Sequence, residues 1–307
     1  MKPLLRIAFL AALVYLQGCG GCIKKSGTTD QEQISKSKSK IPVPVATDNL
    51  TINDEKDLIG YWAGEFGPAA ADSLREDAEG DLENNKINIS IDEIDGAKVK
   101  GHTVIAGKVR FFKCEMKKNG PKYSFTFKAA ADEKATGVFK FGITEGDSLM
   151  KGSWTAGDRH IWNHEYILTK KHFAYQADWK LRPANYVDYS KSKIVQHKAD
   201  SEVYNESRFA TTSEDVEKIN ASATLLKKED VANLKKADFL VVRNSIFARH
   251  GYTFKKPLLS LYFSQQPWYV PISNDVTAEI TPLEKKNLAL MARYEKNAQE
   301  YYNAFGR

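Results

Sequence analysis

The stretch Ile87-Asn88-Ile89-Ser90-Ile91-Asp92 decides the fold class, because apolar and polar residues alternate along it with a period of two. The same alternation returns in Tyr123-Ser124-Phe125-Thr126-Phe127-Lys128. A β-strand points successive side chains to opposite faces, so each stretch predicts a strand that is buried on one face.

Six further segments between residues 58 and 171 are predicted strands, separated by turn signals such as Asp95-Gly96 and Asn119-Gly120-Pro121. They are Leu58–Phe66, Ala97–Ile105, Lys108–Lys117, Gly137–Ile143, Ser148–Thr155 and His164–Lys170. About eight antiparallel strands in meander order favour a closed barrel, because closure removes the two unpaired edges of an open sheet. Such a barrel has room for side chains or for one small ligand.

We expect side chains to fill this barrel, and carriage of a small apolar ligand is the alternative. The expected inward residues are Ile87, Ile89, Phe111, Phe125, Phe127, Phe139 and Phe141. The opening Leu58–Gly64 and the late Lys151–Trp154 resemble lipocalin-like (calycin-like) barrels, in which Trp62 would close one end. Cys114 lies within an apolar run and is expected to be a small core residue.

The small and acidic segment from Pro68 to Asn85 interrupts the strand pattern. We expect a solvated loop at one mouth of the barrel, and a lid or ligand loop is the alternative.

The last third of the chain changes to helical periodicity. Residues 239–254 predict a helix that ends at Gly251 in a left-handed cap, and a shorter helix is expected over residues 256–263. Pro267-Trp268-Tyr269-Val270-Pro271 predicts an extended aromatic crossing. Thr281-Pro282-Leu283-Glu284 combines an N-cap, a proline at the first helical position and a capping-box glutamate. The fold class is therefore α+β, with an eight-stranded antiparallel barrel followed by a small three-helix domain.

Several motifs in this last third resemble, in order and spacing, the YARHG domain of bacterial exported proteins. They are Ile246–Phe254, Tyr262-Phe263, Trp268-Tyr269 and Glu284–Asn287. The resemblance covers about Leu225 to Asn297, with Phe247 where the family usually has a tyrosine. It implies a small extracellular domain without an established activity. The candidate recognition or structural residues are Arg249, His250, Gly251, Tyr252, Trp268 and Tyr269.

Arg249 and His250 have three interpretations. The favoured one is structural: they hydrogen-bond the end of the helix and a carboxylate such as Glu284 or Glu295. Recognition of an acidic ligand, such as a cell-wall peptide or a phosphate group, is the second. The third, catalysis, needs a further acid, base or nucleophile, for which the segment offers only those two glutamates.

The N-terminus carries Lys2 and Arg6, then an apolar run from Ile7 to Leu16, which is the order of a secretory signal and is too short to span a bilayer. Leu16-Gln17-Gly18-Cys19 resembles a lipobox. That resemblance implies cleavage before Cys19, three acyl chains on Cys19 and retention on a membrane. Gly20 after the cysteine favours the outer membrane.

The predicted organisation is a signal peptide (1–18), a lipidated flexible tether (19–56), the barrel (57–171), an aromatic connector (172–222) and the YARHG-like domain (223–307). Ser35-Lys36-Ser37-Lys38-Ser39-Lys40 marks the tether as too polar to fold on its own. A solvated spacer is favoured there over a segment that binds anionic lipid.

The formal charge is only +6, and lysine and glutamate are interspersed along the chain, which argues against a nucleic-acid protein with a concentrated basic face. Cys22 and Cys114, which remain after lipidation, form neither a disulfide framework nor a metal site. His160 and His164 lie four apart in a predicted strand and turn, where that spacing does not align two ligands. We expect no metal and no cofactor.

The functional expectation is a membrane-anchored envelope lipoprotein that binds or scaffolds without catalysis. Its partners would be the membrane, through the lipid, and an envelope protein, the cell wall or a small apolar ligand. The alternative from another class is a hydrolase that acts on envelope polymers.

Overall fold

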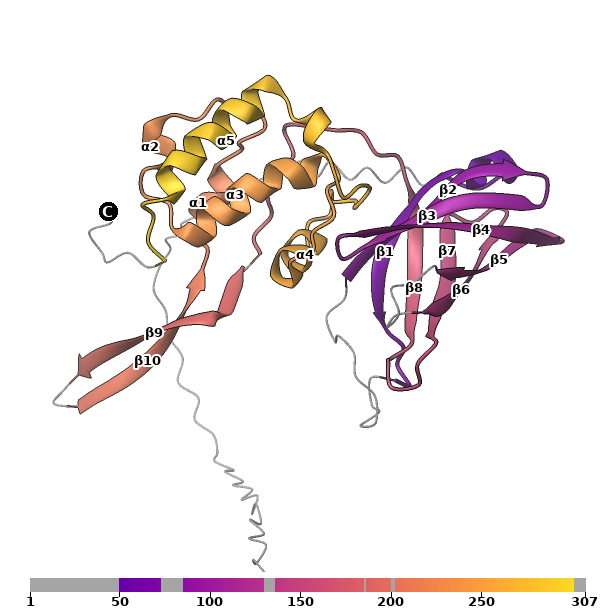
Figure 1. Cartoon of the computed structure of the whole chain (residues 1–307), viewed down its shortest axis with the longest axis horizontal. Helices are drawn as coiled ribbons and strands as arrows, with labels where there is room; N and C mark the ends of the chain where they lie inside the picture. The colour runs from indigo at the N-terminus through magenta and orange to yellow at the C-terminus, as the bar shows by residue number, and fades with distance from the viewer. Residues whose placement is uncertain (1–49, 73–84, 130–135, 185, 200–201, 301–307) are drawn as a thin grey trace, which may run out of the picture. The chain divides into compact units, whose positions relative to one another are not determined.

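The computed structural model describes residues 50–72, 85–129, 136–184, 186–199 and 202–300. A closed antiparallel barrel of eight strands comes first, and β1 pairs with β8 to complete the ring (Figure 1). The strands are β1 (Gly60–Pro68), β2 (Asn85–Asp95), β3 (Lys98–Ile105), β4 (Lys108–Asn119), β5 (Lys122–Ala129), β6 (Gly137–Thr144), β7 (Leu149–Ala156) and β8 (His164–Lys171). The predicted barrel is confirmed.

Aromatic side chains occupy the inside of the barrel. The rings of Phe112 and Phe127 stack with centroids 3.8 Å apart, and those of Phe125 and Phe141 stack at 4.5 Å. The prediction that Phe111 faces inward is wrong, because its side chain is 73% exposed while that of Phe112 is 5% exposed. Adjacent strand residues face opposite sides, so only one of this pair can enter the core.

Two glycines make room for these large side chains. A Cβ atom at Gly101 would lie 2.5 Å from Cζ of Phe112, and one at Gly137 would lie 2.2 Å from Nε1 of Trp154. Both distances are shorter than non-bonded atoms allow. Only glycine therefore fits at each position while the aromatic side chain beside it keeps its place. Cys114 is half-buried against the same core, and burial raises the pKa of its thiol to about 11.

A short 3₁₀-helix, η1 (Glu55–Leu58), packs on the barrel core just before β1. Asp54 and Asp57 form a capping box at its start, and Nε1 of Trp62 donates to the carbonyl of Leu58 at 3.0 Å. Ile52 is fully buried in the same cluster. The folded part therefore begins earlier than the predicted tether boundary at residue 56.

The predicted connector contains a β-hairpin that was not predicted from the sequence. Strand β9 (Val187–Ala199) pairs antiparallel with β10 (Glu202–Thr211), with a register shift between Phe209 and Ala210. Large apolar side chains are exposed on it, including Ile194 at 65% and Val203 at 62%. Few of its residues follow a clean alternation of apolar and polar, which is why periodicity did not reveal it.

The helical region contains three longer helices, as predicted, and two single-turn helices that were not. The longer ones are α3 (Lys236–Arg249), α4 (Pro257–Ser264) and α5 (Pro282–Glu295). The short ones are α1 (Asp215–Lys218) and α2 (Lys228–Val231), and a 3₁₀-turn, η2 (Thr277–Glu279), precedes α5. Thr281 and Glu284 form the predicted capping box of α5.

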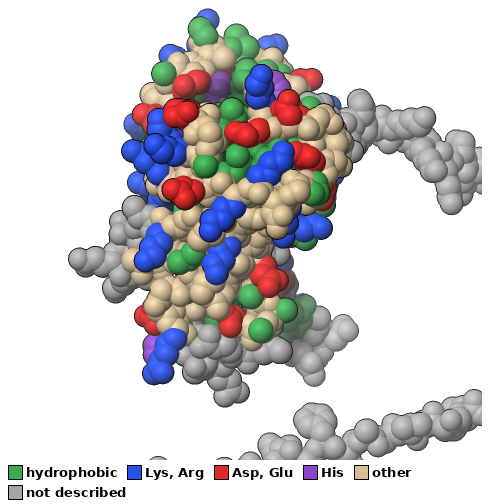
Figure 2. Space-filling view, turned by 90° about the vertical axis from the view of Figure 1, so that its right-hand side faces the viewer, with side chains coloured by type: hydrophobic (Ala, Val, Ile, Leu, Met, Phe, Trp, Pro, Cys, Tyr) green, Lys and Arg blue, Asp and Glu red, His purple; other side chains and the backbone are tan. Residues whose placement is uncertain are grey.

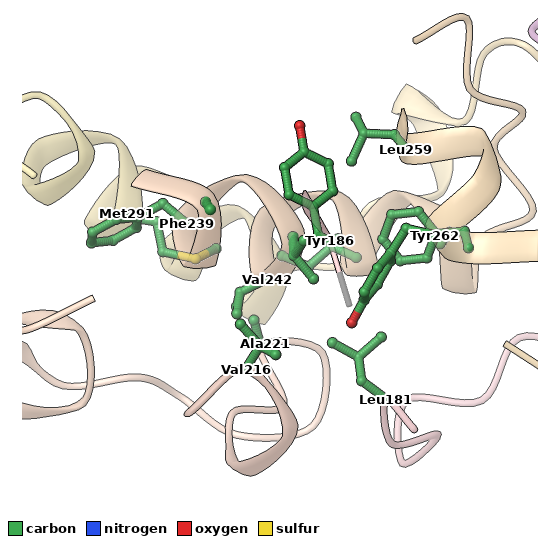
Figure 3. Close-up of a cluster of buried hydrophobic side chains, with 14 of the residues drawn as sticks. Leu181, Tyr186, Val216, Ala221, Phe239, Val242, Leu259, Tyr262 and Met291 are labelled. Atoms are coloured by element: carbon green, nitrogen blue, oxygen red, sulfur yellow. The ribbon is translucent and has the colours of Figure 1, made fainter. Parts of the chain in front are cut away.

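The core of the helical region includes residues from the connector. In the close-up, side chains of α3, α4 and α5 such as Phe239, Tyr262 and Met291 converge with Leu181 and Tyr186, which precede the helices (Figure 3). Part of the predicted connector therefore completes this core.

Lys86 of β2 bonds to the segment that follows α4. Its Nζ donates to the carbonyls of Gln266 at 3.1 Å and Tyr269 at 3.0 Å. Burial lowers the pKa of this amine to about 8, and the charge of Lys171 contributes. On the β3–β4 turn, the N–H of Gly107 donates to Oγ1 of Thr253 at 3.0 Å.

The predicted signal, Cys19 and most of the tether lie outside the described residues, as does most of the loop predicted between Pro68 and Asn85.

Candidate functional site

The candidate motif lies where the chain leaves α3. The helix ends at Arg249, and Gly251 adopts a φ of +79°, the left-handed conformation that glycine accepts most easily. The N–H of Gly251 donates to Ala248 at 3.0 Å, and that of Tyr252 to Phe247 at 3.0 Å. These two bonds satisfy carbonyls that the helix end would otherwise leave without partners.

His250, Glu284 and Tyr175 form a buried hydrogen-bonded cluster. Nε2 of His250 lies 2.8 Å from Oε2 of Glu284, and the hydroxyl of Tyr175 donates to Oε1 at 3.0 Å. The rings of Tyr175 and His250 stack with centroids 4.2 Å apart. The N–H of Thr281 also donates to the carboxylate, at 2.9 Å. The side chains of the His250–Glu284 pair are 4% and 0% exposed.

The electrostatics of this cluster favour an ionised carboxylate. Burial raises the pKa of Glu284, but the hydrogen bonds from His250 and from the backbone of Thr281 outweigh it and lower the pKa to about 2. Burial and the negative charge of Glu284 raise the pKa of Tyr175 to about 12. An ionised carboxylate only accepts hydrogen bonds, so Nε2 of His250 carries the proton between them.

Arg249 is fully buried and points away from the end of its helix. Its Nε donates to the carbonyl of Trp179 at 2.9 Å, Nη2 donates to the same oxygen, and Nη1 donates to Oγ of Ser245 at 2.7 Å. The guanidinium lies 5.5 Å from the ring centroid of Trp268, within range of a cation–π contact. Burial lowers the pKa of Arg249 to about 10, so it remains charged at neutral pH.

Trp268 and Tyr269 join the motif to its surroundings. Nε1 of Trp268 donates to the carbonyl of Lys180 at 2.9 Å, and its ring stacks on that of Trp179 at 5.5 Å. The hydroxyl of Tyr269 donates to the carbonyl of Tyr252 at 2.9 Å. Both side chains are buried, at 7% and 2% exposure.

The structure therefore brings the six candidate residues into one buried region, but through partners that the sequence did not indicate. Glu284 accepts from His250 as one of the two predicted carboxylates, whereas Glu295 lies 3.4 Å from Arg243 instead. Arg249 bonds to the connector carbonyl of Trp179 and not to the last carbonyls of its own helix.

Three further buried polar residues hold the same region together. Asn287 accepts from the N–H of Leu226 at 2.9 Å and donates to two carbonyls. An asparagine on an otherwise apolar helical face was a usable signal for this role. Oε1 of Gln266 accepts from the N–H of Arg182, and Oδ1 of Asp238 accepts from the N–H of Ser213. No sequence pattern indicated these roles for Gln266 and Asp238.

A histidine, a carboxylate and a tyrosine hydroxyl are groups that can move protons, but here they contact one another inside the domain. Among the described residues, no group of three His, Cys, Asp or Glu side chains has a metal-binding arrangement. His164, one of the two histidines that lie four apart in the sequence, instead stacks its ring on that of Phe66, with the ring centroids 4.4 Å apart. None of the described helices has the length and apolar character needed to cross a membrane.

Comparison with known proteins bears on the helical region alone. No curated protein and no solved structure matches the chain, so the likeness of the barrel to lipocalin-like proteins stays a prediction. Residues 215–296, which span α1 to α5 and include His250 and Glu284 of the buried cluster but not Tyr175, match the family model of the YARHG domain, a module typical of exported proteins.

Proposed function

We propose that the chain is an exported lipoprotein, anchored through Cys19, whose folded part binds or scaffolds in the cell envelope without catalysis. The anchor is inferred from the lipobox-like order of residues 16–19, and the YARHG domain supports export. With Gly20 after the cysteine, the outer membrane is the favoured site.

The observation that carries the non-enzymatic part is the burial of the charged YARHG residues. Arg249 and Glu284 are both 0% exposed, and their polar atoms bond to the connector, to Ser245 and to His250. A substrate could reach these groups only if the core opened. Their contacts fit a role in fixing the shape of a rigid module, which supports binding over hydrolysis of envelope polymers.

The barrel interior also favours a binding or scaffolding role over carriage of an apolar ligand. Its inward aromatic rings contact one another at stacking distance, which supports a core filled by side chains.

The anchor is tested by Cys19→Ser, with Cys22→Ser as the matched control in the same segment. We expect Cys19→Ser to leave the membrane fraction or to retain its signal, while Cys22→Ser is processed and sediments like the wild type. A Cys19→Ser chain that is cut and sediments normally contradicts the anchor.

The non-enzymatic role is tested by Arg249→Ala and His250→Ala. We expect both to lower thermal stability. A variant with wild-type stability that has lost hydrolysis of cell-wall polymer would instead support the enzyme.

A further inference from the structure

Lysine is the most frequent residue at the outward positions of four adjacent barrel strands, β3 to β6. The outward side chains that carry positive charge there, called the lysine face below, are Lys98, Lys100, Lys113, Lys117, Lys122, Lys128 and Lys140, and all are exposed. Glu115 is the one carboxylate at an outward position of these strands. In the space-filling view, several Lys and Arg side chains lie together near the left-hand edge, with Asp and Glu side chains above and below them, and others are spread over the rest of the visible face (Figure 2).

The sheet register sets one pair of like charges beside each other and places one lysine between two carboxylates. Lys100 of β3 stands directly opposite Lys113 of β4, whereas Lys98 lies opposite Asp95 of β2 and Glu115 of β4. Like charges in opposite positions destabilise a sheet, and opposite charges there stabilise it. The excess positive charge therefore lies on the outward positions of β4 to β6, where the exposed lysines are Lys113, Lys117, Lys122, Lys128 and Lys140.

Most of these charges are directed to solvent. Lys100 pairs with Glu93 of β2 at 2.7 Å, but no ion pair involves the other six lysines within the described part of the chain. Lys118, at the end of β4, differs because it pairs with Glu145 at 2.7 Å, and it is not part of the face. The lysine face thus carries a concentrated positive charge despite the even spread of charge along the sequence.

The chemistry of the face favours phosphate head groups over nucleic acid. Its cations are lysines, which act as point charges, whereas the planar fork of arginine suits bidentate contacts to nucleic acid. Phe111, 73% exposed beside Lys113, and His102, whose ring centroid lies 5.7 Å away, are the only ring side chains at outward positions of β3 to β6, all of which are described except at the C-terminal end of β5. The surface therefore has one pair of rings and no longer series for stacking bases. One exposed phenylalanine among lysines matches the boundary of a lipid layer.

The tether makes a membrane the nearest polyanion. About 30 residues separate Cys19 from Leu50, so a lipid on Cys19 would keep the barrel within about 100 Å of the bilayer, the greatest distance that a chain of that length can span. We propose that the lysine face docks the barrel onto an anionic phospholipid surface, an inference that rests on the proposed membrane anchor. Docking would hold the folded part directly against the bilayer.

Vesicle binding tests this proposal. The mature chain from residue 19 onward, produced without residues 1–18 and carrying Cys19→Ser so that it cannot be lipidated, is sedimented with vesicles of phosphatidylcholine alone or enriched in phosphatidylglycerol. We expect binding to the anionic vesicles only, with loss at high salt because screening shortens the reach of charge. The triple variant Lys113→Glu, Lys117→Glu, Lys140→Glu should bind at least about tenfold more weakly.

A matched variant controls for net charge. Lys227→Glu, Lys285→Glu, Lys286→Glu makes the same charge change at exposed positions of the helical region and should bind as the parent does. If charge reversal on the barrel impairs folding, judged by circular dichroism, the corresponding glutamine variant replaces it. Equal losses in the two triple variants, binding to neutral vesicles, or tighter binding to duplex DNA than to anionic vesicles would overturn the assignment. Because this chain carries no lipid, the result is independent of the fractionation test of the anchor.

Discussion

Glu284→Gln isolates the charge at the centre of the buried YARHG cluster. The carboxylate accepts hydrogen bonds from His250 at 2.8 Å, from the backbone of Thr281 at 2.9 Å and from Tyr175 at 3.0 Å. Glutamine has nearly the same shape but only one acceptor oxygen. At least one of these donors then faces the NH2 of the amide, which cannot accept a hydrogen bond. We expect a loss of about 1–3 kcal/mol in the free energy of unfolding at pH 7, the usual cost of an unmatched buried polar group.

The pH dependence gives the sharper test. The pKa of Glu284 falls from an ordinary value of 4.5 to about 2 in the folded protein. A lowered carboxyl pKa stabilises the fold fully above pH 4.5, and that stabilisation is lost as the pH falls from 4.5 toward 2. The difference corresponds to about 3 kcal/mol. The glutamine variant has no proton to bind there, so its stability should change less across this window.

Urea denaturation at pH 7, 5, 4 and 3, followed by circular dichroism at 222 nm, measures both effects. Subtracting the variant from the wild type removes the contribution of other carboxyls whose pKa is lowered, such as Asp188 and Asp275. Glu229→Gln, an exposed glutamate in α2, is the matched control and should keep the wild-type slope. If Glu284→Gln keeps the full acid sensitivity of the wild type, the assigned role of this carboxylate is refuted.

Three further changes have predicted outcomes. Gly251→Val should lower the free energy of unfolding by about 1–3 kcal/mol, because φ is +79° and a Cβ atom would lie 3.1 Å from Ile272. Gly251→Ala should lower it by less, and thermal melting of the two variants shows which is the less stable. Trp268→Ala should cost about 3–5 kcal/mol in urea denaturation, since its buried ring is removed, and full retention of stability would contradict its role as a core plug. Burial lowers the pKa of Lys86 to about 8 in the folded protein, so between pH 8 and 10.5 the unfolded chain binds the proton of this amine more tightly. The free energy of unfolding should therefore rise with pH in this range. Lys86→Met should flatten that rise, as measured by urea denaturation between pH 8 and 10.5.

The barrel was predictable because its signal is local. A half-buried strand repeats every two residues, and each predicted strand overlaps an observed one. The one wrong orientation, at Phe111 and Phe112, falls where two adjacent phenylalanines break the alternation. What decides between them is Gly101 on the next strand, where the absent Cβ leaves space for Phe112. That information lies across the sheet and not within the strand.

The helical site was predictable only in its local parts. The caps at Gly251 and Thr281 depend on neighbours within a few residues, and the structure has both. The partners of Arg249 and Trp268 are carbonyls of Trp179 and Lys180, some 70 and 88 residues away, and a backbone carbonyl carries no sequence signal. Sequence therefore identified the motif but not the connector segment that its charged residues hold.

The distribution of lysine shows why the mixture of charges along a sequence does not determine the charge of a folded surface. Along the sequence, Lys113, Glu115 and Lys117 alternate with apolar or polar neighbours, and lysine and glutamate look evenly mixed. A strand sends every second residue to the same face, so a period-two sequence separates its charged residues from its apolar ones. Neighbouring strands in register then place Lys100 opposite Lys113 and extend the pattern sideways. The even mixture of lysine and glutamate along the chain therefore does not describe the outer surface of β3 to β6, because charge density on a sheet depends on cross-strand register, which the order of residues along the chain does not reveal.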